Sequence, residues 1–105
     1  MEEVDVKKIR EMLSPVFRKN KVKKAVLFGS FSRKSQTRRS DLDLIIITET
    51  DKRFFDRYEQ FDNIHEIIKD RTVDMLIYTA GELSNIAHRP FIKKILSEGE
   101  VIYES

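Results

Sequence analysis

The sequence contains no cysteine among its 105 residues and no long apolar run. The absence of cysteine excludes disulfides, thiolate catalysis and cysteine-based zinc sites. No apolar stretch approaches the ~20 residues that a membrane-spanning helix needs. The charged start, Met1 to Asp5, also lacks the apolar region of a secretory signal. These absences predict a cytoplasmic protein.

A strong charge of either sign is also missing, because 20 Lys and Arg residues nearly balance 18 Asp and Glu residues. The resulting net charge of +2 is too small to indicate nucleic-acid binding by itself. Charged residues nevertheless make up 36 % of the chain, against roughly 25 % in an average domain. The length suits one domain with one core, so residues 1–105 are predicted to form a single domain.

The spacing of apolar residues predicts alternating helices and strands, with no repeat and no linker. We expect a helix over 4–20 that Pro15 kinks or divides, with Ser14 as a second N-cap. The other predicted elements are strands at 23–28, 42–49, 72–78 and 101–103, and helices at 54–69, 81–88 and 90–97. This order predicts an α/β (α+β) fold in which helices pack against a small mixed β-sheet.

The most informative segment connects the first two predicted strands. Gly29 and Ser30 follow the strand-like residues 25–28, and ten residues then separate Ser30 from Asp41 and Asp43. Residues i and i+2 of a strand share a face, so the two carboxylates would project side by side and repel unless a cation lies between them. A divalent ion is the usual cation in such a site. A Gly-Ser turn can present N–H groups and a hydroxyl to phosphate. The pattern therefore predicts a site for a metal–nucleotide complex.

This segment resembles the Gly-Ser-x10-Asp-x-Asp signature of the nucleotidyltransferase superfamily that includes DNA polymerase β. It is most similar to the small proteins called minimal nucleotidyltransferases. The resemblance implies a polymerase β-like palm with the first two core strands adjacent and antiparallel. It also implies a third carboxylate on a later strand, a position that Asp74 matches. One departure is Lys34 directly after Arg33, where the family often has glycine.

The resemblance implies nucleotidyl transfer with two Mg²⁺ ions about 3.5–4 Å apart. Asp41 and Asp43 would bridge the two ions. Asp74 would complete the site of the ion that binds the acceptor hydroxyl, and would accept the proton of that hydroxyl. Oxygen ligands favour Mg²⁺ over Zn²⁺. The predicted catalytic and metal-binding residues are Asp41, Asp43 and Asp74, and the predicted nucleotide-binding residues are Gly29, Ser30 and Arg33.

Two functional readings remain open from the sequence. The first is an enzyme that moves a nucleoside monophosphate, AMP from ATP, to a hydroxyl acceptor. For this reading the resemblance suggests an antitoxin that modifies an all-helical HEPN toxin. The alternative is a non-catalytic module that binds a nucleotide or partner, such as an antitoxin acting by complex formation. The segment after Tyr78 is too short for a separate acceptor-binding domain, so we expect a helical protein partner or a second copy of the chain.

An apolar stripe on the predicted helix 90–97 allows two interpretations. Its members recur at helical spacing, which favours packing against the core and leaves a partner surface as the alternative. The stripe consists of Phe91, Ile92, Ile95 and Leu96.

Overall fold

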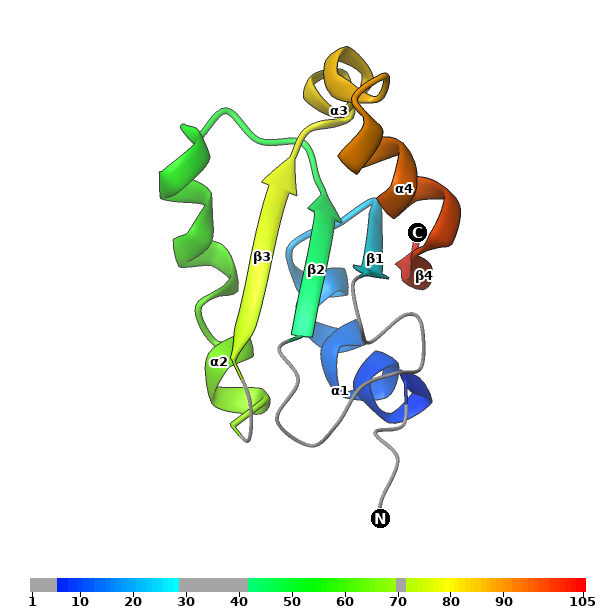
Figure 1. The fold of residues 1–105 in the computed structure, drawn as a ribbon. Helices are drawn as coiled ribbons and strands as arrows, with labels where there is room; N and C mark the ends of the chain where they lie inside the picture. The colour runs from blue at the N-terminus through cyan, green and yellow to red at the C-terminus, as the bar shows by residue number, and fades with distance from the viewer. Residues whose placement is uncertain (1–5, 29–41, 70–71) are drawn as a thin grey trace.

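The computed structural model describes residues 6–28, 42–69 and 72–105 (Figure 1). Its elements are α1 (Val6–Lys19), β1 (Lys24–Phe28), β2 (Leu42–Ile47), the 3-10 helix η1 (Phe54–Phe61), α2 (Ile64–Ile67), β3 (Val73–Tyr78), α3 (Ala80–Ile86), α4 (Pro90–Glu98) and β4 (Glu100–Glu104). In the described part of the chain, no helix is long and apolar enough to cross a membrane.

The strands form one sheet in the order β3-β2-β1-β4. Strand β1 is antiparallel to both β2 and β4, whereas β2 and β3 are parallel. The predicted α/β class with a mixed sheet is therefore confirmed. The first two core strands are adjacent and antiparallel, as the resemblance implied.

The larger core lies on the sheet face that α1, η1 and α2 cover. Strand β2 explains the division of the core, because alternate residues of a strand point to opposite faces. Leu42, Leu44 and Ile46 belong to the core under α1, η1 and α2, whereas Ile45 and Ile47 pack under α3 and α4. The continuous apolar run of β2 thus matches a strand that is covered on both faces.

The smaller core lies under α3 and α4, on the face that carries Ile45 and Ile47. Pro90 begins α4 and Gly99 caps its end, as the pattern predicted. A methyl group at Gly99 would meet the Ile95 carbonyl oxygen at 2.5 Å and the Leu27 carbonyl oxygen at 2.9 Å. Only glycine therefore allows α4 to end this close to β1.

Of the two outcomes expected at Pro15, a kinked helix or two separate helices, the second is wrong. Helix α1 runs without a break from Val6 to Lys19, and Ser14 Oγ donates to the Arg10 carbonyl oxygen at 2.6 Å instead of capping a new helix. Pro15 removes one helical hydrogen bond, but burial of a continuous apolar face compensates for this loss. That face consists of Ile9, Leu13, Val16 and Phe17.

The expected single helix over 54–69 is also wrong. The segment forms η1, turns at Asp62 and Asn63, and continues as the four-residue α2. Arg57 and Tyr58 of η1 donate hydrogen bonds to backbone carbonyl oxygens of β3. These tertiary bonds outweigh the α-helical preference of the local sequence, which is weak by comparison.

Candidate active site

Two of the predicted acids are register partners on neighbouring strands. The parallel pairing of β2 and β3 aligns Asp43 with Asp74, followed by Leu44 with Met75 and Ile45 with Leu76. Neighbouring strands lie about 4.8 Å apart, and register partners project from the same face. Asp43 is half-buried and Asp74 is exposed. The structure therefore places these two residues side by side on one face, at one end of the sheet.

The alternation of side chains also determines which face carries the acids. Asp43 shares its face with Ile45 and Ile47, and Asp74 shares its face with Leu76 and Tyr78. This is the face that α3 and α4 cover farther along the strands. The carboxylates thus lie at the end where β2 and β3 begin, on the side of the sheet opposite α1.

The other predicted site residues, Gly29, Ser30, Arg33 and Asp41, lie outside the described residues. The residues that flank them are described and lie at the acid end of the sheet. Phe28, the last residue of β1, is the register partner of Asp43, and Leu42 begins β2 directly before it. The chain therefore leaves β1 and enters β2 beside Asp43.

The donor set of the described site consists of carboxylate oxygens, which suit a hard divalent cation. Within the described ranges, no group of three or more acidic or histidine side chains is placed to hold a metal ion. Asp43 and Asp74 supply two of the three acids in the predicted set, and the third, Asp41, is outside those ranges. The donors present fit Mg²⁺ in chemical type.

Aromatic side chains flank both acids, a feature that the sequence analysis did not identify. On the Asp43 side, the rings of Phe28 and Phe91 meet edge-on, with centroids 6.0 Å apart and planes at 83°. On the Asp74 side, the Tyr58 hydroxyl donates to the Met75 carbonyl oxygen at 2.5 Å. Burial raises the pKa of Tyr58, and the charges of Tyr78 and Asp74 raise it further.

The sequence left two interpretations of the apolar stripe on α4, packing in the core or a partner surface, and its four residues do not all follow the same one. Ile92 and Ile95 are buried at 4 % and 3 % exposure, so they pack in the core as expected. Phe91 and Leu96 are 59 % and 41 % exposed, so the core interpretation is wrong for these two residues. Phe91 and Leu96 therefore contribute apolar surface outside the buried core.

A buried arginine connects η1, β3 and α3 near the end of β3 that is farther from Asp74. Arg57, only 4 % exposed, donates to the carbonyl oxygens of Lys52 at 2.9 Å and Ile77 at 3.0 Å. Its guanidinium also forms a bidentate pair with Glu82, with N–O distances of 2.6 and 2.9 Å. Glu82 in turn forms a capping box with Thr79 at the start of α3. The spacing Thr79-x-x-Glu82 is a sequence signal for this cap. No sequence pattern indicated the ion pair between Arg57 and Glu82.

The Arg57–Glu82 pair predicts a specific loss of stability in acid. The hydrogen bond from Arg57, with a further one from the Thr79 N–H, lowers the pKa of Glu82 from 4.5 to about 2. A depressed pKa means that the pair stabilises the fold fully above pH 4.5 and loses this contribution as pH falls towards about 2. We expect Glu82→Gln to have a lower melting temperature than wild type at pH 7. The difference between the two melting temperatures should decrease as pH falls through this range.

Thermal unfolding followed by circular dichroism from pH 7 to pH 2 tests this expectation. Glu49→Gln is the matched control, because Glu49 pairs with Lys23 at 3.4 Å with both side chains more than half exposed. Such pairs contribute less than about 1 kcal/mol. A constant difference in melting temperature between wild type and Glu82→Gln across the whole range would contradict the linkage.

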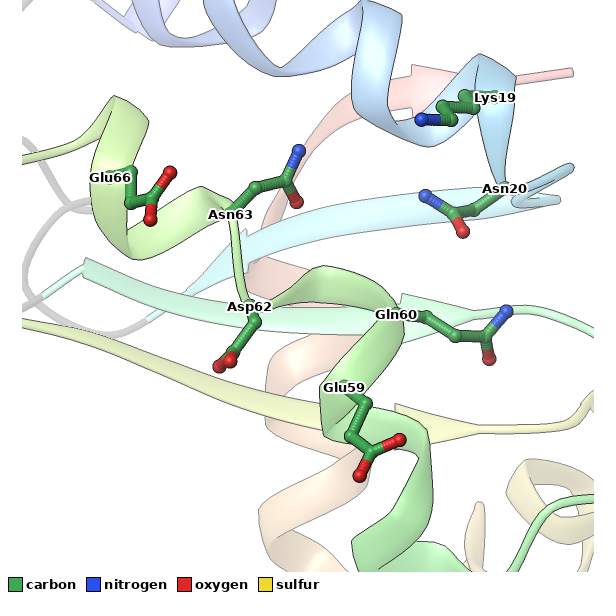
Figure 2. A pocket seen from close by; sticks show the side chains of 7 residues that line it. All are labelled: Lys19, Asn20, Glu59, Gln60, Asp62, Asn63 and Glu66. Carbon is green, nitrogen blue, oxygen red and sulfur yellow. The ribbon is translucent and has the colours of Figure 1, made fainter.

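A polar hollow of about 420 Å³ lies between the end of α1 and the η1–α2 segment (Figure 2). It is lined by Lys19, Asn20, Glu59, Gln60, Asp62, Asn63 and Glu66. These residues belong to elements on the sheet face opposite Asp43 and Asp74. The hollow is therefore separate from the acid pair.

The family model for the polymerase beta nucleotidyltransferase domain matches residues 7–105. The chain belongs to this family. The predicted membership of the nucleotidyltransferase superfamily is thereby confirmed. Among sequence relatives, the chain is 32 % identical over 87 residues to the candidate protein adenylyltransferase MJ0126 of Methanocaldococcus jannaschii, an alignment that covers 81 % of this chain and 79 % of the relative.

Solved structures of toxin–antitoxin assemblies share the fold. One, described as a toxin–antitoxin with AMP-PNP, matches with a TM-score of 0.68 at 21 % identity, over 91 % of this chain and 73 % of that one. Another, of the toxin–antitoxin MntA–HepT, matches with a TM-score of 0.59 at 17 % identity, over 91 % of this chain and 70 % of that one. At this identity the likeness shows a common nucleotidyltransferase fold.

Proposed function

We propose that this nucleotidyltransferase transfers AMP from ATP to a hydroxyl group of a partner protein, with Mg²⁺ as its cofactor. The observation that carries the proposal is the register pairing of Asp43 with Asp74 at one end of the sheet. Two carboxylates side by side on one face offer the oxygen donors that a hard divalent cation prefers. The presence of two such acids in register in a member of this family supports metal-dependent transfer.

The metal would be held by Asp41, Asp43 and Asp74. When bound, it neutralises charge on the triphosphate and lowers the pKa of the acceptor hydroxyl. Gly29, Ser30 and Arg33 would bind the phosphates. The acceptor oxygen forms a bond to the α-phosphorus, the bond between the α-phosphorus and the bridging oxygen breaks, and pyrophosphate leaves. Asp74 accepts the acceptor's proton, because its exposed position leaves it open to an incoming hydroxyl.

The choice of ATP and of a protein acceptor draws on the similar proteins. The M. jannaschii relative is named as a candidate protein adenylyltransferase, and a structural neighbour was solved with AMP-PNP. The MntA–HepT structure is a toxin–antitoxin assembly. We extend this to a partner of the helical HEPN class whose Tyr, Ser or Thr hydroxyl receives AMP. Positioning supplies much of the rate in such a transfer, and a partner can provide it.

The test is transfer of labelled AMP in the presence and absence of the protein encoded beside this one. The protein is incubated with ATP labelled in its adenosine and Mg²⁺, and intact masses of both proteins are measured. We expect the neighbour to gain the mass of AMP, with little transfer when it is omitted. Efficient transfer to a small molecule by the isolated protein would exclude the partner requirement. A stable complex without any transfer would instead favour the non-catalytic binding module.

A further inference from the structure

We propose that Phe91, supported by Phe28, is the surface on which the base of the bound nucleotide stacks. This inference rests on the proposed function, because it assumes that the triphosphate is held at Asp43. It adds a base-recognition site on α4, an element outside the acid motif. The observation behind it is that the exposed ring of Phe91 contacts Phe28, which is the register partner of Asp43.

The position of Phe91 is determined by its neighbours. Ile92 and Ile95 bury one side of α4 against β1 and β2, which anchors the helix. Phe91 lies in the first turn after Pro90, and its ring meets Phe28 edge-on. This contact orients the ring while 59 % of the residue stays exposed. A ring that is oriented and exposed loses little conformational entropy when a planar ligand covers it.

The distance from the acids suits the base rather than the phosphates. Phe28 is directly across from Asp43 on an antiparallel strand, so their Cβ atoms are about 5 Å apart. The centroid of the Phe91 ring lies 6.0 Å from that of the Phe28 ring. In a nucleotide the ribose separates the base from the α-phosphate. If the acids hold the phosphates through a metal, the base should contact side chains that neighbour the acids rather than the acids themselves. Phe28 lies on the face that carries Asp43, and Phe91 contacts it from α4, whose buried residues pack on the same face.

A second exposed aromatic residue provides a matched comparison. Phe55 of η1 is 82 % exposed and contacts Phe54, which in turn contacts Tyr78. Tyr78 is the register partner of Ile47, four residues along the strands from the acid pair. At about 3.3 Å per residue, this places Phe55 on the order of 13 Å from the acids along the strand direction. Phe55 is therefore an aromatic residue, more exposed than Phe91, that should not touch the nucleotide.

The experiment compares ATP with inorganic tripolyphosphate, which has the phosphates but no base. Calorimetric titrations in Mg²⁺ measure both ligands on wild type, Phe91→Ala and Phe55→Ala. Base stacking on an aromatic ring accounts for roughly 5- to 150-fold in affinity. We expect Phe91→Ala to weaken ATP binding about tenfold or more and to leave tripolyphosphate binding unchanged. Phe55→Ala should change neither affinity.

The absence of tryptophan from the chain allows a direct optical readout. In Phe91→Trp the only indole would report on stacking, and ATP should quench its fluorescence whereas tripolyphosphate should not. In Phe55→Trp neither ligand should change the signal. The tryptophan variant at position 91 should also retain ATP affinity, because indole provides a larger stacking surface than phenyl.

The outcomes separate this inference from the proposed function. If wild type binds ATP and tripolyphosphate equally, or if Phe91→Ala affects both ligands alike, stacking is excluded while the metal–phosphate site stands. If Phe91→Ala weakens capture of the partner protein but not ATP binding, the residue is a partner contact and the inference fails. If wild type shows no Mg²⁺-dependent binding of either ligand, the proposed function fails and the inference fails with it.

Discussion

Replacing Asp43 by alanine is expected to abolish Mg²⁺-dependent ATP binding and to reduce AMP transfer at least about a hundredfold. Asp43 lies between Phe28 on β1 and Asp74 on β3, so it is the residue of the described site that has a neighbour on both adjoining strands. Its removal takes away a carboxylate that would help to hold Mg²⁺. The fold should survive, because the change also removes repulsion between neighbouring acids.

Calorimetry of ATP binding with and without Mg²⁺ measures the effect, and the melting temperature verifies the fold. Asp51→Ala is the matched control, since Asp51 is an exposed carboxylate beyond the far end of β2. This control should bind ATP as wild type does. Metal-dependent binding that is unchanged in Asp43→Ala would defeat the assignment of the acid site.

Replacing Asp74 by asparagine is expected to separate binding from transfer. Asparagine preserves the shape of the side chain but cannot accept a proton, and general-base catalysis contributes typically 10²–10⁴-fold. We therefore expect much of the ATP binding to remain while the transfer rate falls by about this factor. Single-turnover transfer of labelled AMP, alongside calorimetry of ATP binding, measures the two effects separately.

Tyr58 offers an independent check on the same variant. The negative charge of Asp74 contributes to the raised pKa of Tyr58, after burial and the charge of Tyr78. Removing that charge in Asp74→Asn should lower the pKa of the phenol, which ultraviolet titration detects. If the phenol shifts as expected but transfer is unaffected, Asp74 lies where the structure places it and is not the general base. If ATP binding is lost together with transfer, Asp74 contributes to nucleotide binding instead of acting only as the general base.

Several features of the fold were predictable because the sequence encodes them locally. The apolar runs at 24–28 and 42–47 contain residues that must be buried, and both form central strands. Pro90 and Gly99 mark the two ends of α4, since their backbone preferences act within a single turn. The identity of Asp43 and Asp74 as site candidates came from the motif and the family resemblance. Their catalytic roles stay predictions.

Other features depended on contacts between distant segments. The α-helix expected over 54–69 became η1 and α2 because Arg57 and Tyr58 bond to the backbone of β3. Pro15 did not divide α1 because the sheet supplies a surface for its whole apolar face. The Arg57–Glu82 pair joins residues 25 positions apart. No periodicity within one element could have indicated these outcomes.

The sequence alone predicted the composition of the site: residue type and spacing indicated which side chains could ligate a metal and which could bind phosphate, and the family resemblance added Asp74. These properties depend on residue type and on spacing over a few residues, where strand geometry is regular. Only the tertiary structure decided that Asp43 is aligned with Asp74, and that Phe91 is exposed beside Phe28. The register of two strands and the crossing of a helix over a sheet depend on how the whole core packs, and that packing involves residues far apart in the chain.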